Sequence, residues 1–282
     1  MSTVLGRRLG GELLRMREAR GLRQAAAAEA LTASVPKVAK IERGLVPVRD
    51  PDVRALCHLY EVTDPDTVAG LLHMAKLDRE RRKAKGWWKQ YPEKADIAEY
   101  IGMEDVAVRV RSWQLSLVPG LLQTPDYTAA LGGGQAIGMD ADLIKQSVEI
   151  KQNRQARLSG DKPLSLWAVV WEPALRQQVG GCAVMSEQLR HLLEMADKPN
   201  VRLQVLPLSA GAFPGMPGAF SIVSFAESDA IDVVYADSTS GTVWLESEAQ
   251  AALHGELFDG TVHLALSERS SVDLIHRIRE ET

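Results

Sequence analysis

Side chains that can bind phosphate or a base edge are concentrated between residues 23 and 43. Lysine and arginine pair with phosphate oxygens, and amides and hydroxyls can bond to phosphates or to bases. Neighbouring apolar side chains can contact a thymine methyl group. The candidate contact residues are Arg23, Gln24, Ser34, Val35, Pro36, Lys37, Lys40 and Arg43. This chemistry is recognition of a polyanion, without covalent bond making.

Most of these candidates belong to one predicted helix, which runs from Ser34 to Gly44. Serine is common at helix N-caps, so Ser34 is a suitable first residue. Pro36 lies near the first turn, where the amide hydrogen that proline lacks would have no partner within the helix. Val38 and Ile41, three residues apart, would face the core and leave the basic side chains outside. A short basic helix with an exposed N-terminus fits the major groove of DNA.

Four more helices are expected around this reading helix. The first, from Leu5 to Gly21, carries leucines at helical spacing. The second, Leu22–Leu31, is rich in alanine and so permits close approach of a neighbour. A fourth and a fifth, at about 53–60 and 68–75, would complete a five-helix domain. On the solvent side of the first helix we place Arg7, Arg8, Arg15, Arg17 and Arg20.

This arrangement resembles the XRE-type, lambda-repressor-like helix-turn-helix family over roughly residues 5–75. In that family a G-L-x-Q motif starts the second helix and I-E-R-G ends the reading helix. The matching residues here are Gly21-Leu22-Arg23-Gln24 and Ile41-Glu42-Arg43-Gly44. The resemblance implies phosphate contacts for Arg23 and Gln24, and a cap or an internal pair for Glu42. It also implies a positive-φ helix end at Gly44. The residues that would face the groove are Val35, Pro36, Lys37 and Lys40.

The start of the reading helix departs from the family pattern. Many members carry an amide or hydroxyl side chain at the first exposed position, whereas Val35 and Pro36 offer only apolar contact. Lys37 and Lys40 would then make most of the polar contacts. Lysine lacks the planar fork of arginine, so we expect modest base discrimination or a dependence on DNA shape.

The charge is divided along the chain. The formal net charge is −4, yet residues 1–90 hold 18 Lys+Arg against 11 Asp+Glu, which gives +7, and residues 91–282 carry −11. This division is consistent with a protein in which only the basic N-terminal part is attracted to phosphate. The alternative is a helical protein-interaction domain whose lysines are a solvated face. We favour DNA, because the charge division and the basic helix point the same way.

The rest of the chain is expected to be mixed. Residues 76–89 form a basic run with few apolar residues, interpreted as a helical connector, and the pattern changes at Trp87-Trp88. Predicted strands lie at 164–170, 201–205, 220–225, 231–236 and 242–245, the last two joined by a hairpin loop at 238–241. Predicted helices lie at 97–108, from Thr124-Pro125, and at 140–158, 186–196, 246–258 and 267–279, with a loop at 132–134. The fold class is therefore α+β multidomain, with an all-α first domain and a mixed α/β second domain whose sheet of about five strands is covered by helices.

The second part resembles the uncharacterised C-terminal domain that follows such a helix-turn-helix in many actinobacterial regulators. The residues that carry the resemblance are Gly86-Trp87-Trp88, Val118-Pro119-Gly120-Leu121-Leu122-Gln123-Thr124, Arg154-Gln155-Ala156-Arg157-Leu158, Gln188-Leu189, Val205-Leu206-Pro207 and the loop from Gly211 to Phe220. The resemblance implies a transcriptional regulator or antitoxin-like protein, often encoded beside a small partner protein.

Nothing in the second part has the spacing of a catalytic or metal site. The six histidines fit no metal-ligand motif, and the glycines of 211–218 lack the ending of a phosphate-binding loop and serve a turn. We therefore expect no enzyme, no cofactor and no metal. Arg154 and Arg157 could hold an anion, but we favour a solvated face, and we read Cys57 and Cys182 as buried thiols. The aromatic residues could line a ligand pocket or form a core, and we favour the core: Trp113, Trp167, Trp171, Trp244, Phe220, Phe225 and Tyr235.

The sequence thus predicts a cytoplasmic transcriptional regulator. Its domains are a helix-turn-helix domain at 1–75, a basic connector at 76–89 and a regulatory and dimerisation domain at 90–282. Its expected partners are double-stranded DNA, a second copy of the chain on a palindromic operator, and a small protein or small-molecule ligand. The alternative is an antitoxin-like protein whose main role is to bind a small partner. No apolar run approaches the roughly 20 residues of a membrane span.

Overall fold

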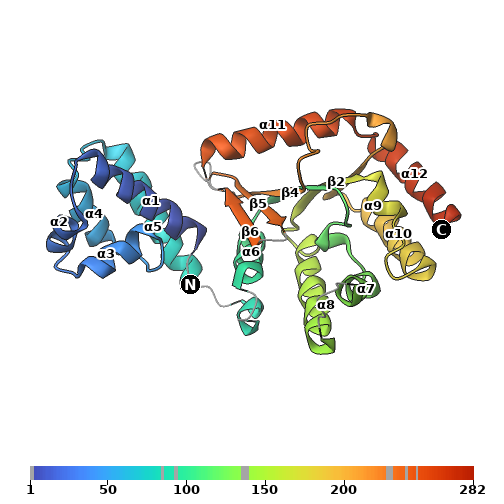
Figure 1. The fold of residues 1–282 in the computed structure, drawn as a ribbon, viewed down its shortest axis with the longest axis horizontal. Helices are drawn as coiled ribbons and strands as arrows, with labels where there is room; N and C mark the ends of the chain where they lie inside the picture. Colours follow the sequence, from blue (N-terminus) through green and yellow to red (C-terminus); the bar gives the residue numbers. More distant parts are fainter. Residues whose placement is uncertain are drawn as a thin grey trace. The chain divides into compact units, whose positions relative to one another are not determined.

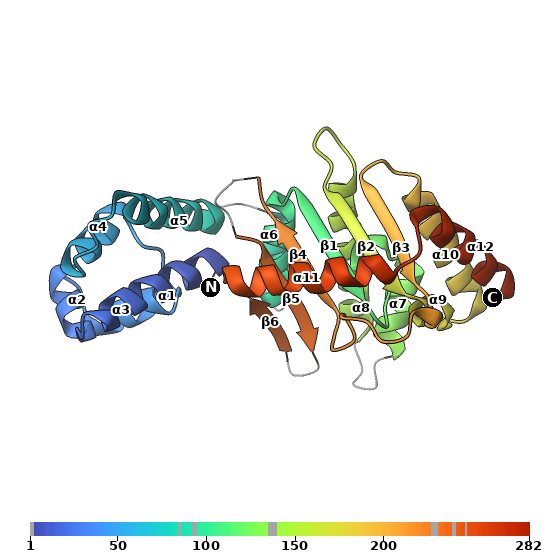
Figure 2. The ribbon, with the colours of Figure 1, turned by 90° about the horizontal axis from the view of Figure 1, so that it is seen from above.

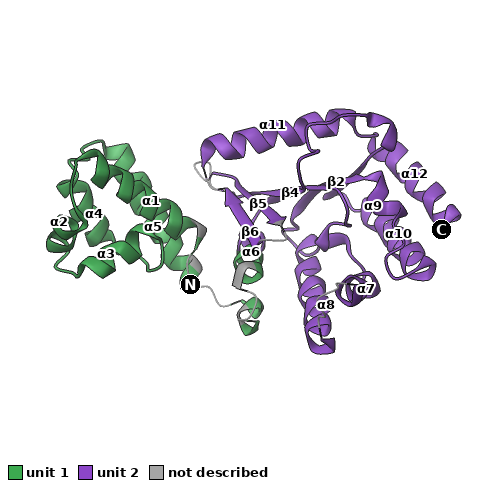
Figure 3. Cartoon of the chain, in the orientation of Figure 1, with its two compact units in different colours: residues 1–102 green, residues 103–282 purple. Residues whose placement is uncertain are grey.

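The computed structural model of this chain describes residues 3–83, 86–91, 95–134, 140–226, 231–238, 241–245 and 247–282. The chain forms two compact units, residues 1–102 and residues 103–282 (Figure 3). The sequence placed its first domain boundary after residue 75. That position lies inside a continuous helix, which runs on to Lys83.

The first unit begins with five helices, as predicted (Figure 1). They are α1 (Val4–Ala19), α2 (Gln24–Ala30), α3 (Val35–Glu42), α4 (Asp50–Leu59) and α5 (Pro65–Lys83). Their apolar faces meet in one core that includes Leu9, Leu13, Val38, Ile41 and Leu56, each no more than 1% exposed. The helical spacing read from the sequence therefore located the inward faces of α1 and α3 correctly.

Local signals set the ends of these helices. The Thr3 side chain caps α1 by accepting a hydrogen bond from the Gly6 amide at 3.0 Å. Gly21 and Gly44 follow α1 and α3 with φ of 65° and 64°, values that cost glycine little because it lacks a Cβ atom. The positive φ expected at Gly44 is thus confirmed.

The end of the first unit contains the aromatic pair. A short 3-10 helix, η1 (Trp87–Gln90), precedes α6 (Ala95–Val106), and the boundary between the units falls within α6. The Trp88 ring is buried and lies edge-on to Trp87, with ring centroids 6.0 Å apart. A Cβ atom on Gly86 would lie 2.2 Å from the Trp88 ring, so glycine is required there for close packing.

The second unit is built on a six-stranded mixed sheet with strand order β3-β2-β1-β4-β5-β6. The strands β1, β2 and β3 pair in parallel, and β4, β5 and β6 continue the sheet with antiparallel pairs. Their bounds are Arg109–Gln114, Ser165–Trp171, Val201–Leu206, Phe220–Ser224, Val233–Ser238 and Gly241–Leu245 in order from β1 to β6. Five of them are the predicted strands. The hairpin of β5 and β6 is confirmed by their pairing, while residues 239 and 240 of its loop lie outside the described residues.

The strand that the sequence reading missed, β1, lies inside the sheet between β2 and β4. The arginines of β1 make its sequence look polar, so no alternation of apolar and polar residues is visible. In the structure Arg111 lies over the sheet rather than in solvent. The Arg111 guanidinium donates to the Asp232 carboxylate at 3.0 Å and lies over the Phe258 ring at 5.8 Å. The expectation of about five strands was therefore one strand short.

Helices cover both faces of the sheet. Figure 1 shows α11 on one face and α7 and α8 on the other, and Figure 2 shows α11 crossing the strands. The helices are α7 (Pro125–Gly134), α8 (Ala141–Gln155), α9 (Glu172–Arg176), α10 (Cys182–Ala196), α11 (Glu248–Leu264) and α12 (Glu268–Glu281), with 3-10 turns η2 (Gly120–Leu122), η3 (Ala156–Leu158) and η4 (Leu208–Ala210). The mixed fold with a helix-covered sheet is as predicted.

Three local expectations for this unit were wrong. The glycines 132–134 end α7 instead of forming a loop, and α10 begins at Cys182, four residues earlier than predicted. The Cys182 side chain is exposed, whereas Cys57 is buried as expected. The short helix α9 was also not foreseen.

Among the described residues, no helix is long and apolar enough to cross a membrane.

Candidate DNA-binding surface

The helices α2 and α3 and the turn between them form the framework of the site. The turn is held by the Thr32 amide, which donates to the Glu29 carbonyl at 2.9 Å, and by the Ala33 amide, which donates to the Ala28 carbonyl at 2.8 Å. Thr32 adopts a positive φ of 48°. Ala27 and Ala28 are buried, and their small side chains leave room for α3. The alanine-rich second helix therefore serves close packing, as expected.

The outward side of α3 presents the predicted contact residues. Six of the candidates from the end of the turn to the end of α3 are exposed: Ser34, Val35, Pro36, Lys37, Lys40 and Arg43. Val35 is 42% exposed, so its apolar side chain is available on the outer side of the helix. The Arg43 Nε atom donates to the Ala39 carbonyl at 3.1 Å, so its guanidinium lies along the helix.

The inward side of α3 ends in a buried ion pair. The Arg17 Nε atom donates to the Glu42 Oε1 atom at 2.6 Å, and the Arg17 Nη2 atom donates to Glu42 Oε2 at 3.2 Å. Both side chains are less than 10% exposed. The hydrogen bond that Arg17 donates to Glu42 raises the pKa of Arg17, in spite of the opposing effect of burial. The pair fixes the last turn of α3 against α1.

Two expectations about this pair had different outcomes. The internal pairing of Glu42 is confirmed, but the placement of Arg17 on the solvent side of α1 was wrong. A signal for Arg17 was present, because it follows Leu9 and Leu13 at intervals of four and so lies on the buried stripe of the helix. The charge of Arg17 suggests a solvent-facing side chain, whereas its position along the helix indicates a buried one.

Two residues at the start of α2 are placed differently. Arg23 immediately precedes α2 and is exposed. Gln24 is partly buried, and its Nε2 atom donates to the Glu42 Oε2 atom at 2.7 Å. In this structure Gln24 thus joins the Arg17–Glu42 pair, and its contact with phosphate stays a prediction.

The N-terminus of α3 lacks the side-chain cap that its sequence suggests. Ser34 occupies the N-cap position with extended backbone angles, but its hydroxyl makes no capping hydrogen bond. Its carbonyl accepts the amides of Lys37 at 2.9 Å and Val38 at 3.2 Å, and Pro36 has no amide hydrogen to satisfy. The helix start is therefore stabilised by backbone bonds, and the Ser34 side chain is exposed.

The motif residues of the second unit have structural partners. Arg154 donates to the Glu104 carboxylate through Nε at 2.8 Å and Nη2 at 2.7 Å, and its side chain is only 12% exposed. Arg157 donates to the carbonyls of Ala107 at 3.0 Å and Lys162 at 3.1 Å. The expectation that Arg154 and Arg157 form a solvated face was therefore wrong.

The segment from Val118 to Thr124 is held by buried amides. The Gln188 Nε2 atom donates to the Leu122 carbonyl, and the Gln188 Oε1 atom accepts from the Thr124 amide, both at 2.7 Å. The Gln123 Nε2 atom donates to the Val118 carbonyl at 2.7 Å. Residues that carry the family resemblance thus fix a turn.

Aromatic residues fill the space between the sheet and α11. The buried Trp113 donates to the Gly215 carbonyl at 2.8 Å and meets Phe213 edge-on at 5.4 Å. Trp167 donates to Gln204 at 2.8 Å and meets Phe258 edge-on at 5.5 Å. The core interpretation holds for these tryptophans. Within the described part of the chain, no group of three or more histidine, cysteine or carboxylate side chains could hold a metal ion.

The fold and the exposed reading helix define a helix-turn-helix protein. Residues 8–71 match a helix-turn-helix domain family, whose XRE-like type is the one that the sequence resembles. Residues 97–277 match the family described as Domain of unknown function (DUF5753), and because this match covers most of the chain, the protein belongs to that family. Neither a curated protein nor a solved structure matches the chain. Helix-turn-helix domains bind DNA through the second of the two helices of the motif. Here the motif consists of α2 and α3, so that helix is α3.

Proposed function

We propose that this protein is a sequence-specific transcriptional regulator that binds DNA through α3. The observation that carries the proposal is the division of α3 into two sides. Its inner side is held by Val38, Ile41 and the Arg17–Glu42 pair, while Lys37 and Lys40 on its outer side are exposed. A rigid helix with outward cations is what the major groove accepts.

We further propose that the protein acts as a homodimer on a palindromic operator. The helix α3 has 8 residues, so it is only about 12 Å long and reaches few base pairs. Two copies related by a two-fold axis would double the contact and set the spacing of the half-sites. The second unit, through a small protein or small-molecule ligand, would control when the dimer binds.

Selection from a random duplex library tests the DNA-binding proposal. The full-length chain should enrich a sequence that binds more tightly than its scrambled version, as measured by fluorescence anisotropy. The change Lys37→Ala with Lys40→Ala should weaken this binding by about 1 to 3 kcal/mol per base-contacting lysine, or lower the salt slope by about one per lysine that contacts phosphate.

A charge-matched control separates contact from net charge. Lys145→Ala with Lys162→Ala removes two exposed lysines of the second unit and should leave binding unchanged. Equal binding by both double variants would contradict the proposal and favour a protein-interaction role for the first unit.

The homodimer is tested by the mass in solution at micromolar concentration, where a single-chain mass with full operator binding would contradict it.

A further inference from the structure

The last eight residues of α5 form part of the helix-turn-helix unit. The sequence suggests that residues 76–83 begin a connector, because few apolar residues occur there. In the structure they complete α5, and Asp78 within them is fully buried. A buried carboxylate is costly unless it is paired and hydrogen-bonded, so its partners reveal what this segment does.

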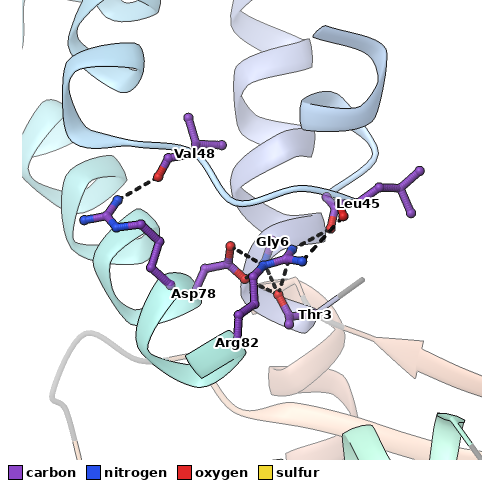
Figure 4. Close-up of polar contacts among 8 residues, drawn as sticks. Thr3, Gly6, Leu45, Val48, Asp78 and Arg82 are labelled. Carbon is purple, nitrogen blue, oxygen red and sulfur yellow. Dashed lines mark hydrogen bonds and ion pairs between the residues drawn. The ribbon is translucent and has the colours of Figure 1, made fainter. Parts of the chain in front are cut away.

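The main partner of Asp78 is Arg82, one turn further along α5. The Arg82 Nε atom donates to both Asp78 oxygens, at 2.8 and 3.0 Å (Figure 4). The hydroxyl of Thr3 also donates to Asp78. Since Thr3 caps α1, the buried carboxylate joins the end of α5 to the start of α1.

The rest of the Arg82 guanidinium reaches the chain just after α3. Its Nη2 atom donates to the Gly44 carbonyl at 2.8 Å, and Nη1 donates to the Leu45 carbonyl at 3.5 Å. Figure 4 shows the Arg82 side chain between Leu45 and Asp78. Asp78 thus orients the guanidinium, and the guanidinium holds the backbone of Gly44 and Leu45, close after the end of α3 at Glu42.

The neighbouring residue Arg79 extends this contact along the same segment. Its Nη1 atom donates to the Val48 carbonyl at 2.6 Å, and its Nη2 atom pairs with Asp50 at 2.7 Å. Residues 44–50 are therefore held against α5 at both ends. This segment joins α3 to α4, so the contacts with α5 act on the chain next to the C-terminal end of α3.

We propose that Arg82 is a positioning residue for DNA recognition. Held by Asp78, it fixes the Gly44–Leu45 backbone and so the orientation of α3; this inference rests on the proposed function of α3. A helix of 8 residues spans about 12 Å, so a tilt of roughly 10° at its held end moves the other end by about 2 Å. Contacts to bases are lost at displacements of this size.

The test compares variants in the full-length chain. Arg82→Gln alone would leave Asp78 buried without its ion-pair partner and could unfold the unit. The double variant Asp78→Asn with Arg82→Gln is therefore the informative one, because it keeps the buried site neutral while removing the bonds to Gly44 and Leu45. Lys76→Gln is the control for the loss of one exposed positive charge on the same helix, whereas the double variant leaves the net charge unchanged.

Two measurements are made on each variant. The first is affinity for a library-selected duplex and for its scrambled version, over a range of salt concentrations. The second is hydrogen exchange of the amides of residues 40–48, followed by mass spectrometry. We expect the double variant to keep its helical circular dichroism, to bind the selected duplex about tenfold more weakly, to bind the scrambled duplex as before, and to exchange faster at 40–48.

Other outcomes would overturn the proposal. Binding and exchange equal to those of Lys76→Gln would show that Arg82 only neutralises Asp78. An equal loss on both duplexes, with a salt slope lowered by about one, would make Arg82 a direct phosphate contact. Should the wild-type chain enrich no duplex, the proposed function fails. The exchange measurement then decides by itself whether Arg82 fixes residues 44–48.

Discussion

The helices α3 and α8 both carry basic side chains, and the two lysines of α3 and the last two basic residues of α8 lie in opposite environments. On α3, Lys37 and Lys40 are exposed. On α8, Lys151 bonds to the Gln123 amide oxygen and Arg154 is paired with a carboxylate that is 1% exposed. Basic residues on a helix can therefore contact another molecule only where the fold leaves them exposed to solvent. Where a buried acid faces them, they stabilise the unit to which they belong.

The largest effect should come from breaking the buried pair of α8. Glu104→Gln leaves the Arg154 guanidinium without its carboxylate, and we expect the free energy of unfolding of the second unit to fall by about 3 to 5 kcal/mol. Tryptophan fluorescence in chemical denaturation can measure this, because four of the six tryptophans lie in the second unit and the helices α1 to α5 contain none. Arg190→Ala, which removes an exposed pair with Glu187, should leave the transition unchanged. Similar curves for both variants would contradict the contrast between buried and exposed charges.

A second test concerns a buried titrating group beneath α3. Burial and the nearby Glu42 carboxylate raise the pKa of Tyr60 from 10.0 to about 12. Below pH 10 the hydroxyl is protonated in both states, and between pH 10 and 12 the unfolded chain loses its proton first. The free energy of unfolding of the first unit should therefore fall by about 2 to 3 kcal/mol over this interval.

The variant Tyr60→Phe provides the control for this pH dependence. Among the described residues, no hydrogen-bond partner is found for the Tyr60 hydroxyl, so its removal should cost little near neutral pH. We expect the decline between pH 10 and 12 to flatten in the variant, as followed by circular dichroism during denaturation. A decline of the same size in both proteins would assign it to other groups.

The smallest effect tests how closely α1 approaches α3. A Cβ atom on Gly10 would lie 2.4 Å from the Ile41 carbonyl oxygen, whereas one on Gly11 would meet nothing within 4 Å. Gly10→Ala should destabilise the first unit by about 1 to 3 kcal/mol. Gly11→Ala, at the next position, should stabilise it by about 0.5 to 1 kcal/mol. Thermal unfolding followed by circular dichroism gives the sign, and changes of the same sign would show that α1 and α3 are not in close backbone contact.

Much of the fold followed from patterns that are local in sequence. The helices α1 to α5 and five of the six strands have an apolar periodicity that can be recognised within a short stretch of sequence. The strand β1 was missed because Arg111 makes its pattern polar, and only the packing of Asp232 and Phe258 around the guanidinium explains that position. The outward residues of α3 were predicted from spacing, since helical geometry fixes which side chains share a face.

The sequence by itself determined that a capped-looking, basic helix follows an alanine-rich one, and that the two halves of the chain differ in charge. Tertiary structure decided which charged residues remain outside. Arg17 and Arg154 come from segments that look polar, yet they pair with carboxylates 25 and 50 residues away. Asp78 and Arg82 lie one turn apart on α5, and their bonds to Thr3 and Gly44 are the ones that no local pattern encodes. The physical reason is that burying a charge depends on a partner at the right place in space, and that partner can be 75 residues away, as Thr3 is from Asp78.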